Sequence, residues 1–150
     1  MTFTEKFIKQ RVAFEAAYKS GDWESLKPFF TEDVVYEVMN IQFHCRIQGR
    51  NRFIEGMDRA TSRFDKLCNR QISRDAYVRE ENSTVLAHTS IRFSRGDSPV
   101  LETSLWEIST YRDGRIERMI DLYNPEDAEK FEQWMLEWGE GLDARYVVPQ

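Results

Sequence analysis

Residues 105–123 carry the clearest strand pattern in the chain. Two runs of alternating apolar and polar residues, 105–111 and 115–123, flank Arg112-Asp113-Gly114, and the Asp-Gly pair suits the positive φ angles of a tight hairpin turn. Alternation in the second run predicts two faces, with Ile116, Arg118, Ile120 and Leu122 on one and Glu117, Met119, Asp121 and Tyr123 on the other. Asp121 therefore shares a face with a methionine and a tyrosine, where a carboxylate needs an explanation.

Local capping signals predict two helices at the start of the chain. Thr2 and Glu5 resemble a capping box, and Gly21 ends the helix that they begin. Asp22 is the expected N-cap of a short helix over about 23–30.

Two longer helical patterns follow. The strongest opens at Gly49, and its apolar residues recur at spacings of one, three and four: Phe53, Ile54, Met57, Ala60, Phe64 and Leu67. The last begins at Asn124, which caps a helix with Pro125 at its first position and extends to about Trp138.

The remaining β-rich runs complete the predicted fold. They are 33–39, 71–79, 84–95 and 100–111, whereas 40–48 is ambiguous. Helices, one strand, a long helix and then a meander of strands predict an α+β domain. In such a domain the helices pack on one face of a curved, mostly antiparallel sheet.

The composition limits the possible functions. With 150 residues, of which 41% are hydrophobic, the chain suits one domain, and we expect a core over about 4–138 and an irregular tail over 139–150. The formal charge of −5 argues against nucleic acid or an anionic membrane as partner. Cys45 and Cys68 form neither a metal-ligand spacing nor a disulfide framework, and the first ten residues lack a secretory apolar region. We therefore expect reduced thiols in a cytoplasmic protein.

Three blocks of sequence occur in a characteristic order: FEAAYKSGDWESLKPFFTEDVVYEV, IQGRNRFIEGM and LWEISTYRDGRIERMIDLYNPEDAEKF. Together they resemble the SnoaL-like branch of the nuclear transport factor 2-like superfamily, over Phe7 to Trp134. The resemblance implies a cystatin-like cone, in which the sheet wraps around the N-terminal helices and leaves a blind apolar pocket. Enzymes with this fold include ketosteroid isomerase, scytalone dehydratase, limonene-epoxide hydrolase and SnoaL-type polyketide cyclases; other members only bind or dimerise.

Asp121 is the position at which the resemblance transfers best. In SnoaL-type cyclases and limonene-epoxide hydrolase, an aspartate on the last strand, shortly before a tyrosine or phenylalanine, acts as general acid or base inside the cone. Asp121-Leu122-Tyr123 matches that pattern. Burial in an apolar pocket would raise the pKa of Asp121, because desolvation disfavours the ion. The alternative is a carboxylate paired with an arginine or facing a subunit interface.

Tyr36 and His88 are the candidate partners of Asp121. Tyr36 aligns with a tyrosine near the catalytic water of the hydrolase, and the alternative is an ordinary half-buried strand aromatic. His88 and Ser90 fall where the hydrolase carries an arginine and an aspartate, so the resemblance does not support epoxide hydrolysis. His88 could instead carry protons, although a lone strand histidine is more often structural or solvent-facing.

Ketosteroid isomerase matches less well. Phe14 stands at the position of its helix tyrosine and Val38 at that of its general base, and Glu107 is the only nearby acidic equivalent of its oxyanion-hole aspartate. We reject steroid isomerisation by that mechanism and expect Glu107 to face outward.

The sequence thus favours a cofactor-free acid/base enzyme without a metal, with Asp121, Tyr36 and His88 as catalytic candidates. Its substrate would be a small apolar, polyketide-like or cyclic molecule that undergoes proton abstraction, dehydration, cyclisation or hydration. The expected substrate-binding residues are Phe14, Phe53, Met57, Trp106, Met119 and Tyr123. The alternative is a non-catalytic binding or dimerisation module. Because Ile116, Ile120 and Leu122 are expected on the outer sheet face, we also expect a homodimer.

Overall fold

A computed structural model describes residues 1–73 and 75–148. Its elements, in chain order, are α1 (Phe3–Ser20), η1 (Trp23–Phe29), β1 (Phe30–Met39), β2 (Cys45–Gln48), α2 (Arg50–Arg63), η2 (Asp65–Leu67), β3 (Asn69–Ile72), β4 (Tyr77–Glu81), β5 (Thr84–Ser94), β6 (Leu101–Arg112), β7 (Arg115–Tyr123) and α3 (Pro125–Trp138). The two η elements are short 3-10 helices.

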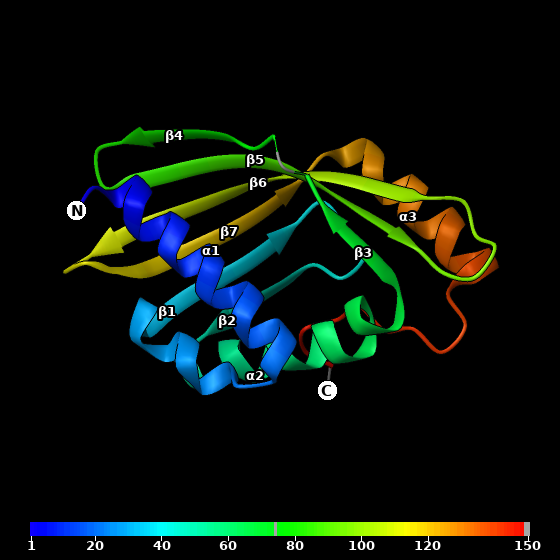
Figure 1. Ribbon diagram of the computed structural model, residues 1–150, viewed down its shortest axis with the longest axis horizontal. Coiled ribbons are helices and arrows are strands. Elements are labelled where there is room, and N and C mark those ends of the chain that lie inside the picture. Colours follow the sequence, from blue (N-terminus) through cyan, green and yellow to red (C-terminus); the bar gives the residue numbers. More distant parts are fainter. Residues whose placement is uncertain (74, 149–150) are drawn as a thin grey trace.

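The strands form one sheet in the order β2-β1-β7-β6-β5-β3, and β4 pairs with the same strand, β5, as β3 does (Figure 1). Strand β1 runs parallel to β7, and the other pairs are antiparallel. The expected α+β fold with a curved, mostly antiparallel sheet is confirmed.

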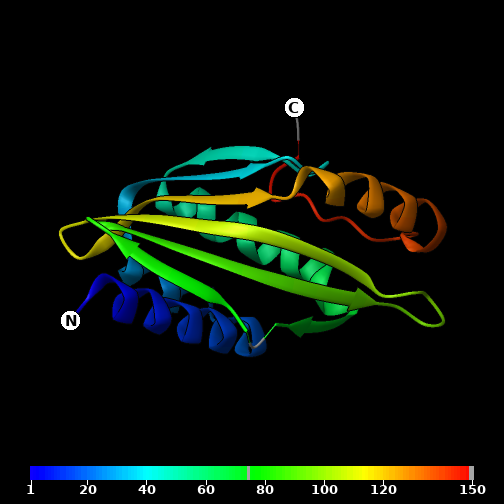
Figure 2. The ribbon, with the colours of Figure 1, turned by 90° about the horizontal axis from the view of Figure 1, so that it is seen from above.

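The helices enclose the inner face of this sheet. Helix α1 crosses in front of the strands in Figure 1, and α2 lies beside β1. Seen from above, α1 and α3 lie on either side of the long strands β5 and β6 (Figure 2). The buried side chains of α1 are Phe7, Gln10, Phe14 and Ala17, and they face the concave interior together with inward residues of the sheet.

Two local predictions are confirmed in detail. Thr2 and Glu5 form the capping box of α1, each side chain bonding the other's backbone N–H. The turn between β6 and β7 has φ angles of 52° at Asp113 and 79° at Gly114. Positive φ at both central residues is the requirement of a type I′ turn, so the Asp-Gly pair closes the hairpin as its chemistry predicts.

The predicted strand over 71–79 is two strands instead. Strand β3 pairs with the second half of β5, and β4 pairs with its first half. Between them the Asp75 backbone N–H donates to the Ser73 hydroxyl at 3.2 Å, a local bond that competes with the sheet ladder; residue 74 lies outside the described residues. The ambiguous stretch 40–48 contains β2, which forms a hairpin with β1.

A bulge near the β6–β7 turn alters the expected faces. Tyr111 pairs with Ile116, whereas the preceding Thr110 pairs with Arg118, so β7 carries one extra residue there. The shift turns Ile116 into the core, where it is fully buried, and not to the outer face as expected. Ile120 and Leu122 keep the outward orientation, half-buried.

Candidate active site

The helices and the inner face of the sheet enclose a cavity of about 80 Å³. One buried water needs roughly 10–15 Å³ on this scale, so the space accommodates a small molecule. Its apolar lining includes Phe14, Met57, Phe64, Phe93, Leu105 and Met119. Its polar lining includes Arg11, Tyr36, Glu107, Asp121, Tyr123 and Tyr146. The cavity therefore combines an apolar surface with a few titratable groups, as ligand sites usually do.

Asp121 and Tyr36 meet in this cavity. They lie on the neighbouring strands β7 and β1, and alternation turns both side chains inward. The Tyr36 hydroxyl donates a hydrogen bond to Asp121 Oδ2. Asp121 Oδ1 is buried and has no hydrogen-bond partner among residues 1–73 and 75–148, so it is the oxygen available to a ligand.

Burial raises the pKa of Asp121 from its usual value of 3.8 to about 7. Loss of hydration is the main cause, and the negative charge of Glu107 acts in the same direction. The hydrogen bond from Tyr36 and the charge of Arg11 act in the opposite direction. A carboxyl group that titrates near neutral pH can both donate and accept a proton there.

This raised pKa predicts a pH-dependent stability. Because the folded state binds the Asp121 proton more tightly than the unfolded state, its contribution is fully present below about pH 4 and is lost as the pH rises through about 7. The free energy of unfolding of the wild type should therefore fall over this range relative to Asp121→Asn, with a slope of up to about 1.4 kcal/mol per pH unit. Urea denaturation at several pH values measures the difference, and parallel curves for the two proteins would contradict it.

Tyr36 is held by aromatic neighbours. Its ring lies 4.5 Å from the Phe53 ring and 5.2 Å from the Tyr146 ring, centroid to centroid. Burial, followed by the charge of Asp121, raises the pKa of Tyr36 well above its usual value. Tyr36 therefore stays protonated and acts as a fixed hydrogen-bond donor.

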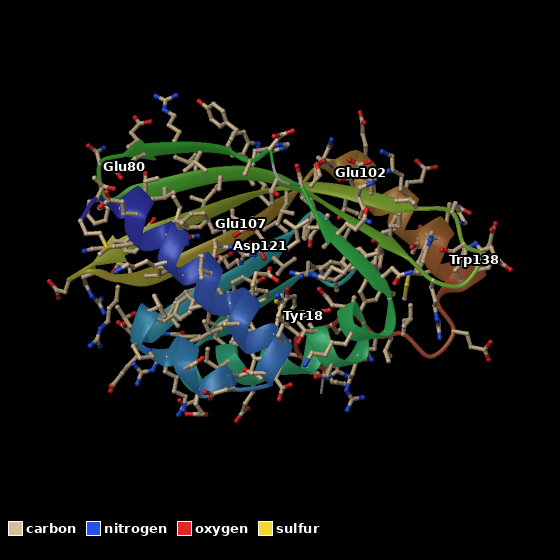
Figure 3. The ribbon with its side chains drawn as sticks, viewed as in Figure 1. Tyr18, Glu80, Glu102, Glu107, Asp121 and Trp138 are labelled. Carbon is tan, nitrogen blue, oxygen red and sulfur yellow. The ribbon has the colours of Figure 1, made fainter. Side chains whose placement is uncertain are left out.

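Glu107 also lies in the cavity, which corrects the expectation that it faces outward. It is 6% exposed, and the register of β6 and β7 places it directly opposite Asp121 (Figure 3). The bulge is the reason. Without it, the register that the two-residue turn sets would continue along both strands and pair Glu107 with Ile120 on the outer face. Arg11 of α1 reaches this carboxylate, with 3.7 Å between Nη1 and Oε2.

The same register turns His88 and Trp106 away from the cavity. They pair across β5 and β6 on the outer face, and their rings lie 4.9 Å apart. Trp106 stands opposite Leu122, one position from Asp121, so the bulge decides its orientation too. Neither side chain can reach a ligand that touches Asp121.

The other predicted pocket residues divide into two groups. Phe14, Met57, Met119 and Tyr123 line the cavity. Phe53 is fully buried one layer behind it, against Phe30 and Tyr36.

Sequence reasoning missed several lining residues. Residues 139–148 form no helix or strand, yet Ala144 and Tyr146 from this segment line the cavity. Asp65 and Arg70 line it as well, and burial raises the pKa of Asp65 to about 6. The large aromatic residue Tyr146 in the tail was the available signal, but an irregular segment has no periodicity from which to place it.

Within the described residues, no three His, Cys, Asp or Glu side chains gather where they could hold a metal ion. None of the described helices is long and apolar enough to cross a membrane.

No family model and no curated protein matches the sequence. Solved structures do match its fold. An LEH-like epoxide hydrolase of M. tuberculosis is 17% identical with a TM-score of 0.61, over 91% of this chain and 96% of that one. An NTF2-like protein of Burkholderia xenovorans LB400 is 12% identical with a TM-score of 0.65, over 84% and 95%. TerC, co-crystallized with polyporic acid, is 15% identical with a TM-score of 0.64, over 87% and 98%.

These similarities define the class of fold. The chain shares the curved-sheet α+β fold of these proteins, which is the fold that the resemblance of its sequence blocks implied. At such identities the similarity establishes the fold alone, and the chemistry has to be argued from the side chains in the cavity.

Proposed function

We propose that this protein is a cofactor-free acid/base enzyme of the SnoaL-like type that acts on a small, largely apolar molecule. One observation carries the proposal. Asp121 is a buried carboxyl group with one oxygen bonded to Tyr36 and the other unpaired at an apolar cavity, among the described residues. A carboxyl group that can both donate and accept a proton in this setting suits catalysis of proton abstraction, dehydration, cyclisation or hydration.

The pKa of Asp121 supports this assignment, because a value of about 7 keeps both protonation states populated near neutral pH. Tyr36 supplies a hydrogen-bond donor that stays protonated. The named neighbours with this fold are compatible with a small-molecule ligand, since one is an epoxide hydrolase and another was crystallised with polyporic acid.

Exchange of the α-hydrogens of 2-tetralone in D₂O tests the proposal. This cyclic ketone is small and apolar, and exchange requires proton removal next to a carbonyl. The wild type should accelerate deuterium incorporation, measured by ¹H NMR, over buffer alone. Glu102→Gln is a matched control, because Glu102 is an exposed carboxylate on β6 outside the cavity, and it should exchange like the wild type.

The alternative is a module that binds a small molecule without transforming it. It would show as 2-tetralone binding in the cavity, detected by shifts of the Met57 and Met119 methyl resonances, with exchange no faster than in buffer. That result would contradict the enzyme proposal.

A homodimer is also expected. The outer face of the sheet carries half-buried Trp106, Ile108, Ile120 and Leu122, an apolar surface suited to a second copy of the chain. Light scattering should give twice the mass of 17.9 kDa. A monomeric mass at micromolar concentration would contradict this prediction.

A further inference from the structure

Two carboxyl groups face each other at the bottom of the proposed site. Glu107 and Asp121 are directly opposite residues of an antiparallel pair, and both line the cavity. Side chains in such positions have Cβ atoms about 4.5–5.5 Å apart. They are only 6% and 9% exposed, respectively, and Figure 3 shows them side by side behind α1.

Each member of the pair has one buried oxygen that accepts no hydrogen bond from the described residues. In the described part of the chain, Glu107 Oε2 and Asp121 Oδ1 are buried without a hydrogen-bond partner. Asp121 Oδ1 has no ion-pair partner either, whereas Glu107 Oε2 lies 3.7 Å from the Arg11 guanidinium; both residues line the cavity.

Within the described residues, Arg11 is the cation that faces the two carboxyl groups. The Arg11 guanidinium lies 3.7 Å from Glu107 Oε2 and 3.8 Å from the Glu15 carboxylate, so it forms ion pairs with both. It also lies over the Phe14 ring. Among the ion pairs of the described residues, none includes Asp121. Two neighbouring carboxylates that share one cation repel each other, and the negative charge of Glu107 accordingly raises the pKa of Asp121.

In the part of the chain that the structure describes, the other charged and titratable groups around the pair are Glu15 of α1, Tyr36 of β1, Cys45 of β2, Asp65 of η2, Arg70 of β3, Tyr123 of β7 and Tyr146 of the segment 139–148. Arg70 is engaged elsewhere, 3.0 Å from Glu15 and 3.2 Å from Asp65. It therefore supplies no second counter-charge to the pair.

We infer that Glu107 is the second catalytic carboxylate of this site and forms a proton-sharing pair with Asp121. Arg11 stabilises the charge on Glu107, and the proton resides on Asp121. Glu107 is then the base and Asp121 the acid. This inference rests on the proposed function and deepens it, because it assigns the site to substrates in which a C–H bond lies next to a carbonyl group.

The step balances within the pair. Glu107 removes the proton from the carbon next to the carbonyl, the C–H electrons form the enol double bond, and the carbonyl oxygen takes the proton of Asp121. The proton then lies on Glu107 and the charge on Asp121, so the pair still holds one proton. Reversal returns a proton to carbon, and in D₂O the proton on Glu107 exchanges with solvent first, which incorporates deuterium.

A titration without substrate tests the shared proton. The Asp121 carboxyl carbon is followed by ¹³C NMR against pH in protein labelled at aspartate and glutamate, with Asp121→Asn to assign the signal. In Glu107→Gln the Asp121 midpoint should fall by about one pH unit, because the neighbouring charge is gone. Glu102→Gln should leave it in place. An unchanged midpoint in Glu107→Gln would overturn the inference.

Two further variants separate charge from damage to the fold. Glu107→Asp keeps a carboxylate and should keep the raised midpoint of Asp121. Arg11→Gln removes the cation and should raise that midpoint, the opposite direction to Glu107→Gln. A midpoint that falls in both Arg11→Gln and Glu107→Gln would indicate general loosening of the site and would overturn the inference.

Exchange of 2-tetralone then separates this inference from the proposed function. Because Glu107 is the base, Glu107→Gln should slow exchange by roughly 10²- to 10⁴-fold, and Glu107→Asp should restore much of the rate. If Asp121→Asn abolishes exchange while Glu107→Gln keeps the wild-type rate and pH profile, the enzyme proposal stands and the role of Glu107 fails. If Glu107→Gln moves the Asp121 midpoint while Asp121→Asn exchanges normally, the shared proton stands and the enzyme proposal fails.

Discussion

Asp121→Asn is expected to slow the exchange of 2-tetralone by roughly 10²- to 10⁴-fold, the usual contribution of a positioned general acid or base. Asparagine has nearly the same shape and can still accept the Tyr36 hydrogen bond through its amide oxygen. It cannot gain or lose a proton in this pH range. The variant should therefore keep its fold and lose its chemistry.

The control for this loss is structural. Circular dichroism and the methyl NMR spectrum of Asp121→Asn should match the wild type, and 2-tetralone should still enter the cavity. The residual rate should also lose the pH dependence near 7 that Asp121 gives the wild type. A folded Asp121→Asn protein with the wild-type rate and profile would remove Asp121 from the mechanism.

Alternation along the chain predicted that Asp121 shares a face with Met119 and Tyr123, and the family resemblance assigned that face to the inside of the cone. Met119, Asp121 and Tyr123 lie on the inner face as the period-two pattern of β7 requires, and Tyr36 follows from the same rule on β1. These residues lie on the side of the bulge away from the turn. Within one unbroken strand segment, the sequence alone determines which side chains share a face.

The pairing of β6 with β7 could not be predicted in the same way. Strand β7 contains one extra residue at the point where its partner strand β6 passes from Thr110 to Tyr111. This bulge shifts the pairing register by one, so every residue of β6 beyond it lies opposite a β7 residue of the other face. That one step brings Glu107 into the cavity and turns Trp106 out. The local composition does not predict the bulge, because the free energy of forming it depends on packing across the sheet.

Contacts between distant segments were the other missing information. Arg11 reaches Glu107 from α1, and Tyr146 reaches the Tyr36 ring from a segment without regular structure. Periodicity identifies which face of a helix is apolar. It does not identify the partner of a polar residue such as Arg11 at the edge of that face, because the partner depends on how the helix packs on the sheet. The acid/base candidate was therefore predictable, whereas its electrostatic environment was not.

Phe53→Ala is expected to have the largest effect on stability, a loss of about 3–5 kcal/mol in the free energy of unfolding. Phe53 is fully buried, with its ring 4.9 Å from Phe30 and 4.5 Å from Tyr36, centroid to centroid. Truncation removes both ring contacts and leaves a space behind Tyr36 that the sheet and α2 cannot close. Urea denaturation at one pH measures the loss.

Leu136→Ala provides the matched control, because Leu136 is an apolar α3 residue that is 76% exposed, and its truncation should cost no more than about 0.5 kcal/mol. Phe53→Leu should retain most of the stability and, since Phe53 lies behind the cavity wall, leave binding of 2-tetralone unchanged. A Phe53→Ala protein as stable as Leu136→Ala would contradict the packing described for Tyr36. If a stable Phe53→Leu protein bound 2-tetralone more weakly, Phe53 would contact the ligand, as expected from the sequence.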